Sequence, residues 1–381
     1  MITVWAVKIG VVLGMILTSC AYLIYIERKL AAYMQDRIGP NRVGPFGLLQ
    51  PLADGIKFLL KEDVVPRHCD RFLFYMAPSL AIMTTMLAFA VVPFGPTSTD
   101  PDEWQFVIAP GVDVGMVFIF AVGSLAVYSI ILGGWASNNK YSMLGALRSS
   151  AQVISYEIPL GTSILGVVLL AGSLNLEDII QFQASNGFLH WNLWTQPLAA
   201  LIFATSALAE SNRLPFDLPE CEQELIGGYH TEYSAMKFAM FFLGEYTHVI
   251  TISFLMSVLF LGGWHFPWIA EVGSHYNGVG AVKCGVLAAK VFAIIIFIML
   301  IRWTIPRFRF DQLMSLAWQG LVPLSFFNLA FVMFAKQFNW PVWVLTVASL
   351  ALLVGASALN GMRLQRRLRV GSVSSPALGK I

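Results

Sequence analysis

Long apolar runs, repeated along most of the chain, decide what this sequence can fold into. A helix needs roughly 20 apolar residues to cross the hydrocarbon core of a bilayer. About nine such runs occur, with approximate ranges 4–26, 73–93, 114–136, 151–171, 197–210, 238–262, 282–303, 315–335 and 341–361. Backbone polar groups inside a bilayer must be satisfied within the segment, so each run predicts a helix. The sequence therefore predicts an all-α polytopic membrane protein. The fifth run is short, and Trp191 and Trp194 would extend it upstream.

Composition supports this class of protein and argues against others. Of the 381 residues, 57% are hydrophobic and only 12% are charged, whereas soluble domains average about 25% charged residues. The first run lacks a basic leader region and a cleavage site, so we expect it to be retained as a span. The four cysteines are scattered without metal-ligand spacing, and phosphate-loop, dinucleotide and nucleophile–base motifs are missing. We therefore expect no redox centre, metal or NADH site in this chain, and no nucleic-acid partner.

The placement of basic residues predicts the orientation in the membrane. Eight Lys and Arg residues lie between the first two runs, none lies in 94–113, and this alternation continues nearly throughout. Because basic loops stay on the cytoplasmic side, we expect the N-terminus outside and the C-terminus inside, which requires an odd number of spans. Residues 1–362 then form a single transmembrane domain, and 363–381 form a basic and then disordered cytoplasmic tail.

Acidic residues concentrate between the fifth and sixth runs. The stretch 208–246 contains seven of the chain's 22 acidic residues: Glu210, Asp217, Glu220, Glu222, Glu224, Glu232 and Glu245. Only Arg213 and Lys237 oppose them. Placing charged carboxylates beside hydrocarbon costs free energy, so this density indicates a function in binding or transferring protons or cations. A solvated surface loop explains Glu222 and Glu224 equally well. It fits Glu245 much less well, because Glu245 lies inside an apolar run.

A further carboxylate, Glu157, lies at the head of the fourth predicted span. Pro159 suits the first turn of a helix, where proline loses no needed hydrogen bond. A carboxylate in a first turn is also favoured by the helix dipole. Helix capping and a role in proton transfer are therefore equal interpretations of Glu157.

The loop between the first two spans predicts an amphipathic interfacial helix. Residues 48–60 carry most of their Leu and Ile side chains on one side, and Asp54 and Lys57 are neighbours on the polar side. Membrane anchoring is the simpler interpretation of this segment, and a wall for an amphipathic ligand is the functional one. After the seventh span, arginines alternate with aromatic residues at Arg302, Arg307 and Arg309. Anchoring accounts for at least two of them, and one could face the same ligand.

Three stretches together carry a resemblance to one family. They are ERKLAAYMQDRIGPNRVGPFGLLQPLADGIKFLLKED (27–63), LAESNRLPFDLPECEQELIGGYHTEYSAMKFAMFFLGEY (208–246) and RWTIPRFRFDQLM (302–314). Over about 4–335 the chain resembles the H subunit of bacterial NADH:quinone oxidoreductase, respiratory complex I, and its mitochondrial counterpart. Related membrane-bound hydrogenases carry weaker versions of these motifs.

The resemblance implies a subunit that forms the membrane side of a quinone tunnel beside the peripheral arm. The substrate would be ubiquinone or menaquinone, with FMN and iron–sulfur clusters in partner subunits. By their positions in the motifs, the implied quinone-binding residues are Arg37, Asp54 and Lys57, with Arg302 a weaker candidate. The implied proton-coupling residues are Glu210, Arg213, Asp217, Glu220, Glu222 and Glu224 in a coupling loop, and Glu157, Glu232 and Glu245 on a buried carboxylate path.

The resemblance also implies partners and a location. The partners are the peripheral-arm quinone-site subunits, neighbouring small membrane subunits and the lipid bilayer. The mitochondrial form ends after eight spans, so the ninth favours a bacterial inner membrane over the mitochondrial inner membrane. A stand-alone proton or cation transporter remains an alternative, although large inside loops suit docking to a soluble partner better. A purely structural membrane anchor would not explain the acidic residues inside the apolar runs.

Overall fold

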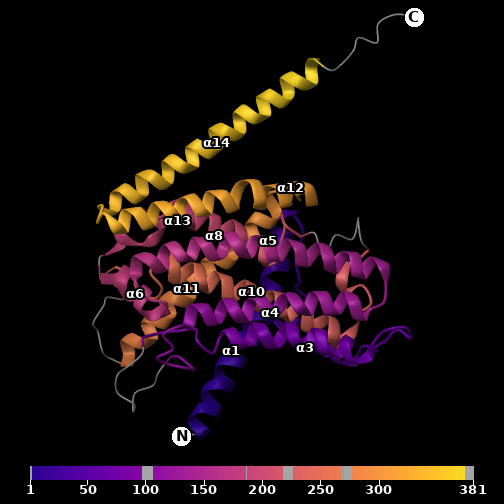
Figure 1. The fold of residues 1–381 in the computed structure, drawn as a ribbon. Helices are drawn as coiled ribbons and strands as arrows, with labels where there is room; N and C mark the ends of the chain where they lie inside the picture. Colours follow the sequence, from indigo (N-terminus) through magenta and orange to yellow (C-terminus); the bar gives the residue numbers. More distant parts are fainter. Residues whose placement is uncertain are drawn as a thin grey trace, which may run out of the picture.

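The computed structural model describes residues 2–96, 106–185, 187–217, 226–267, 269 and 277–373. The regular elements of these residues are helices (Figure 1). Seven helical segments of the described chain are long and apolar enough to cross a membrane. This confirms the prediction of an all-α polytopic membrane protein.

The long helices occupy the predicted apolar runs. They are α1 (Ile2–Met34), α3 (Arg71–Ala88), α4 (Gly115–Ala136), α5 (Lys140–Ala171), α10 (Ala235–Phe260) and α11 (Asn277–Thr304), followed by α12 (Phe310–Ser315), the π-helical turn η4 (Leu316–Leu321) and α13 (Val322–Gln337), which form one continuous segment. The fifth and ninth runs are α8 (Pro197–Glu210) and α14 (Val342–Val373). The apolar parts of these two are shorter, at Pro197–Glu210 and Val342–Ala358.

Short helices complete the chain between the long ones. They are η1 (Pro45–Gly47), α2 (Gln50–Leu60), α6 (Leu176–Ser185), η2 (Phe188–His190), α7 (Asn192–Thr195) and η3 (Gly228–His230). Trp194 lies in α7 and Trp191 precedes it. Gln196, with the non-helical angles φ −132° and ψ 62°, separates α7 from α8. The alternative in which the fifth span continues through these tryptophans is therefore wrong.

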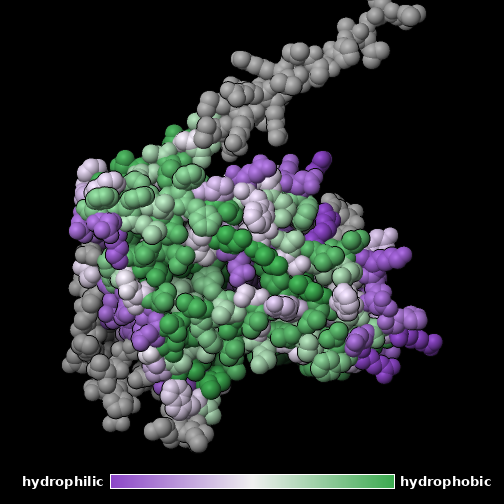
Figure 2. All heavy atoms as spheres, in the orientation of Figure 1, coloured by the Kyte–Doolittle hydropathy of each residue, from purple (hydrophilic) through white to green (hydrophobic). Residues whose placement is uncertain are grey.

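The bundle is organised around α5, which packs against α4, α8 and α13. The helix α3 packs on α4 and α10, while α1 crosses α10 and α11. In Figure 1, α14 leans away from the bundle on the side opposite the start of α1. Hydrophobic residues cover the middle of the face in Figure 2, and hydrophilic residues gather at its two ends. This distribution is expected of a protein whose middle contacts the hydrocarbon core of a bilayer and whose ends contact water.

The start of α5 corrects one expectation about Glu157. The helix begins at Lys140, where the Asn139 side chain caps it by accepting a hydrogen bond from the Tyr141 amide at 3.0 Å. Glu157 therefore lies in the middle of α5, and the prediction of a first-turn capping position is wrong. Pro159 lies inside the helix, where it removes one backbone hydrogen bond. Glu157 is therefore not a helix-capping residue.

A lysine from α11 closes the far end of α10. The Lys290 ammonium donates to the carbonyl oxygens of Leu261 at 2.7 Å, Gly263 at 2.8 Å and His265 at 2.7 Å. It also lies over the Trp191 ring, 4.3 Å from the centroid. Carbonyls at a helix C-terminus lack intrahelical partners and carry partial negative charge. Lys290 therefore ties α11 to the end of α10.

Candidate functional site

A buried carboxylate in the second half of α1 gathers two guanidinium groups. Glu27 is 5% exposed and accepts hydrogen bonds from Arg213 at 3.1 and 3.0 Å and from the Tyr246 hydroxyl at 2.5 Å. Arg302 forms a second ion pair with Glu27. The Arg213 guanidinium also lies 4.1 Å from the centroid of the Tyr246 ring. We call these four residues the Glu27 cluster. A buried charge must be paired, so the cluster fixes α1, α10, α11 and the loop after α8 at one point.

The segment that follows α11 holds the described part of the predicted coupling loop. Arg307 pairs with Asp217 at 3.1 Å, and the Phe308 amide donates to the Pro215 carbonyl at 3.2 Å. The Phe216 ring lies between the rings of Tyr156 and Phe308, with centroids 5.6 and 5.5 Å apart.

The helix α5 also holds this loop. Gln152 is fully buried, and its side-chain amide donates to the carbonyl oxygens of Ala209 and Phe216, both at 2.8 Å. The segment between these two carbonyls contains Arg213. The predicted residue Arg213 thus stands on a stretch of chain that is fixed at both ends, and the predicted residue Asp217 directly follows this stretch. Glu220, Glu222 and Glu224, predicted on the same loop, lie outside the described residues.

The amphipathic helix α2 brings one predicted quinone-binding residue toward the Glu27 cluster. Asp54 pairs with Arg28 at 2.7 Å and accepts a hydrogen bond from Gln50 at 3.2 Å. Arg28 directly follows Glu27 in the chain. The Lys57 ammonium lies 5.1 Å from the Phe58 ring centroid. Asp54 therefore links α2 to α1 through its ion pair with Arg28. Arg37 is exposed just beyond the end of α1.

Three predicted carboxylates meet near the middle of the bundle. Glu210, the last residue of α8, has an oxygen 3.4 Å from Nε2 of His248 on α10. Glu245 accepts a hydrogen bond from the Tyr229 hydroxyl at 3.1 Å. Glu157 interacts electrostatically with Glu210. We call Glu157, Glu210 and Glu245 the carboxylate group.

Glu232, the remaining carboxylate of the predicted buried path, lies just before α10. Glu232 accepts a hydrogen bond from the side-chain amide of Asn139 at 2.6 Å. Its neighbour His230 packs against the rings of Tyr229 and Phe238. Burial lowers the pKa of His230 to about 4, so this imidazole is neutral at physiological pH. His230 is therefore a packed, uncharged side chain.

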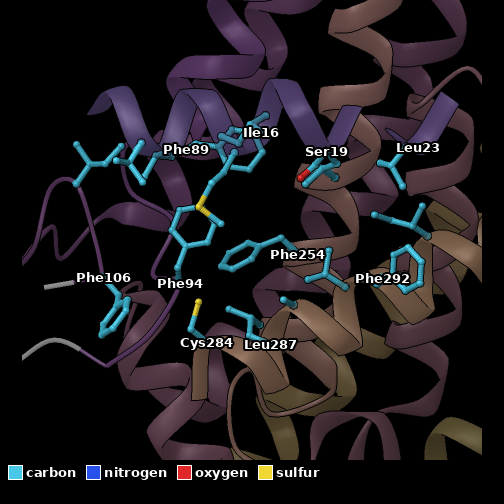
Figure 3. A pocket seen from close by; sticks show the side chains of 18 of the residues that line it. Ile16, Ser19, Leu23, Phe89, Phe94, Phe106, Phe254, Cys284, Leu287 and Phe292 are labelled. Carbon is cyan, nitrogen blue, oxygen red and sulfur yellow. The ribbon is translucent and has the colours of Figure 1, made fainter. Parts of the chain in front are cut away.

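A large apolar groove runs along α1 and ends beside the Glu27 cluster. Its volume is about 750 Å³, and its walls come from α1, α10, α11 and the segments that follow α3. Figure 3 shows Ile16, Ser19 and Leu23 of α1 facing Cys284 and Leu287 of α11 across it. The α1 wall extends to Ile26, the residue before Glu27. The groove thus reaches the residue that precedes the buried Glu27.

Sequence reasoning missed several residues of these groups. Glu27, Arg28, Tyr246, Tyr229 and His248 were not among the candidates. Glu27 ends the first apolar run, and an acid in that position was an available signal. His248 lies three residues after Glu245, a spacing that puts both on one helix face. The described residues contain no group of three or more His, Cys, Asp or Glu that could hold a metal ion.

The chain matches known proteins along most of its length. The model of a family described as NADH dehydrogenase matches residues 7–333. The chain is 46% identical to the H 2 subunit of the NADH-quinone oxidoreductase of Koribacter versatilis over 335 residues, covering 85% of this chain and 94% of that protein. It is 45% identical to the H subunit of the Leptospira biflexa NADH-quinone oxidoreductase over 351 residues, covering 89% and 96%. It is 44% identical to NADH-quinone oxidoreductase subunit 8 of Rhodothermus marinus over 336 residues, covering 86% and 96%.

Proposed function

The chain belongs to the H-subunit family of NADH-quinone oxidoreductases, membrane-arm subunits of complex I, and on that basis we propose that it lines the membrane side of the quinone tunnel and couples quinone reduction to proton translocation. One observation carries the proposal. Arg213 binds Glu27 and stands three residues after Glu210 in a loop fixed by Gln152. A single short segment therefore joins the Glu27 cluster to the carboxylate group.

The quinone part of the proposal rests on the groove and on the charges beside it. Ligand sites are mostly apolar, with a few polar groups that orient the ligand. A quinone has an apolar isoprenoid tail and a head group that accepts hydrogen bonds. We assign the tail to the groove of about 750 Å³ and the head-group path to the charged residues beyond its inner end. The proposed quinone-binding residues are Arg37, Asp54, Lys57 and Arg302.

The coupling part of the proposal is electrostatic. Reduction and protonation of the quinone change the charge near Glu27, and this alters how strongly Arg213 is held. Carboxylates in a low dielectric have coupled protonation states, so a change at one end shifts protons along the group. The proposed coupling residues are Glu157, Glu210, Arg213, Asp217, Glu232 and Glu245, together with Glu220, Glu222 and Glu224 beyond the described residues.

We further propose the arrangement of the chain in its complex. Nine spans with an interfacial α2 would form one transmembrane domain over 1–362, with the N-terminus outside and the tail 363–381 in the bacterial cytoplasm. The peripheral-arm subunits that complete the quinone site would dock on the inside loops, and small membrane subunits would flank the bundle. FMN and iron–sulfur clusters would belong to the partners, which deliver electrons to the quinone. Whether the quinone is ubiquinone or menaquinone stays open.

The test of the quinone site is Asp54→Asn in the assembled complex. We expect inhibitor-sensitive NADH:quinone activity and proton pumping to fall by roughly tenfold or more, because losing a charge-assisted interaction of about 1.5–3 kcal/mol weakens quinone positioning. Electron transfer from NADH to an artificial acceptor should be intact, since it bypasses the quinone. Unchanged quinone kinetics would contradict a quinone-binding role for Asp54 and favour the interpretation of α2 as a membrane anchor.

The alternative function, a stand-alone ion transporter, predicts activity of the isolated chain. If the acids served independent ion transport, the purified chain in liposomes would carry a proton or cation flux. We expect no flux without the partner subunits.

A further inference from the structure

His248 on α10 stands beside Glu210 and lines two small cavities in the bundle. Its Nε2 is 3.4 Å from a Glu210 oxygen, and the two side chains are 18% and 11% exposed. We propose that His248 is a proton-holding residue that exchanges a proton with Glu210, an inference that rests on the coupling function proposed above. In the step, the Glu210 carboxylic acid transfers its proton to Nε2. The products are a carboxylate and an imidazolium, and the reverse transfer restores the neutral acid and the neutral imidazole.

The two cavities share the Glu210–His248 pair as a common wall. The larger, of about 60 Å³, is also lined by Tyr229 and Glu245. The smaller, of about 30 Å³, is also lined by Thr84 and Thr251. A buried water needs about 10–15 Å³ and two to four polar partners, so each cavity has room and partners for water. Glu245 in one cavity is thereby connected through the Glu210–His248 pair to the other.

The charged groups described around the pair are carboxylates. Neither cavity is lined by a described Lys or Arg. The titratable groups that face His248 are Glu245 on its own helix, Glu210 at the end of α8 and Tyr229 on η3, while α3 and α4 present only small, apolar or hydroxyl side chains. Glu157 on α5 acts on Glu210. Neighbouring carboxylates cannot all be ionised in a low dielectric without a counter-charge. Of the described lining groups, His248 is the one that gains a positive charge when it takes up a proton.

The smaller cavity makes His248 a side branch of the proton path. The hydroxyls of Thr84 and Thr251 donate to carbonyl oxygens of their own helices, Leu80 at 2.9 Å and Thr247 at 3.0 Å. Their oxygens are thus oriented as acceptors for water or for the imidazolium. The rest of the described lining includes the apolar residues Ile119, Phe203 and Leu255. Glu210 and His248 are the titratable groups of this described lining, so a proton on His248 returns through Glu210.

The proposal is tested with His248→Gln and His248→Asn in the assembled complex. Both replacements can donate a hydrogen bond to Glu210, but neither can take up a proton. The matched control is His190→Gln, the same change on the exposed η2. We measure quinone reduction and pumped protons per NADH between roughly pH 5 and 8.5, the range in which a histidine titrates. NADH oxidation by an artificial acceptor verifies assembly.

We expect pumping in both His248 variants to fall roughly tenfold at neutral pH. This is less than the ~10²-fold loss expected for a general acid–base group, because Glu210 and cavity water remain. One ionisation in the pH profile should disappear in these variants and persist in the wild type and in His190→Gln. Wild-type pumping with a wild-type pH profile in either variant overturns the proposal.

A second measurement needs no variant. Infrared difference spectra of the wild-type complex with isotope-labelled histidine should show an imidazole-to-imidazolium change on quinone reduction, and its absence also overturns the proposal. Glu157→Gln and Glu245→Gln separate this inference from the coupling function itself. If both leave pumping unchanged, the coupling function fails. If both impair pumping while the His248 variants do not, only the role of His248 fails.

Discussion

At the scale of single residues, the Glu27 cluster joins two arginines to one buried carboxylate. One carboxylate balances Arg213 and Arg302, and Tyr246 donates to it as well. Glu27 directly follows Ile26, the last α1 residue that lines the apolar groove. Guanidinium groups at this point would favour a ligand group that gains electron density, as a quinone head group does on reduction.

Glu27→Gln is the sharpest test of this cluster. The change leaves Arg213 and Arg302 without their shared counter-charge, and breaking a buried ion pair costs about 3–5 kcal/mol. We expect a lower thermal inactivation temperature of the assembled complex and a large loss of quinone reduction, with NADH oxidation by an artificial acceptor retained.

The control for Glu27→Gln is Asp178→Asn on the exposed side of α6, whose carboxylate accepts a hydrogen bond from Ser173. An exposed change of this kind should stay within about 0.5 kcal/mol. Equal inactivation temperatures and equal quinone activity for the two variants would contradict the view that Glu27 joins four segments.

At the scale of elements, a glycine sets how closely α5 approaches η3. A Cβ at Gly145 would lie 2.8 Å from the Cα of Gly228 and 3.0 Å from the Tyr229 amide nitrogen. The Tyr229 side chain donates to Glu245, so this contact positions a member of the carboxylate group.

Gly145→Ala should therefore push η3 away from α5. Overpacking against backbone typically costs about 1–3 kcal/mol, and we expect reduced thermal stability together with reduced proton pumping. Gly161→Ala is the matched control on the same helix, because no atom lies within 4 Å of its Cβ position. Replacing a helical glycine in open space should stabilise by about 0.5–1 kcal/mol. Equal stability of the two variants in heat-inactivation assays would refute the close-contact argument.

The elements also show how far sequence reasoning extends. Apolar runs located every long helix, because hydrocarbon demands about 20 apolar residues. They misplaced the start of α5, because the helix continues from Lys140 through polar residues that hydropathy does not count. They could not pair Glu27 with Arg213 or Arg302, which lie 186 and 275 residues away. Such pairs depend on tertiary packing, and a single sequence does not show them.

At the scale of the whole molecule, the proposed orientation can be tested with fusions to a fluorescent protein that matures only in the cytoplasm. A fusion at residue 381 should fluoresce, because nine spans put the C-terminus inside. A fusion after Asn339, between α13 and α14, should be dark because it ends outside. Immunoblots control for expression. Fluorescence from both fusions would show that α14 does not cross the membrane, and fluorescence from the shorter one alone would show that the proposed orientation is inverted.

The contact of Lys290 with the end of α10 has a consequence for how the chain is made. A lysine at the centre of a helix resists entry into the bilayer by about 2.5–3.5 kcal/mol. In the folded protein its three acceptors belong to the chain that follows α10. The two helices should therefore leave the ribosome-bound insertion channel as a hairpin, with α10 waiting there until α11 has been synthesised.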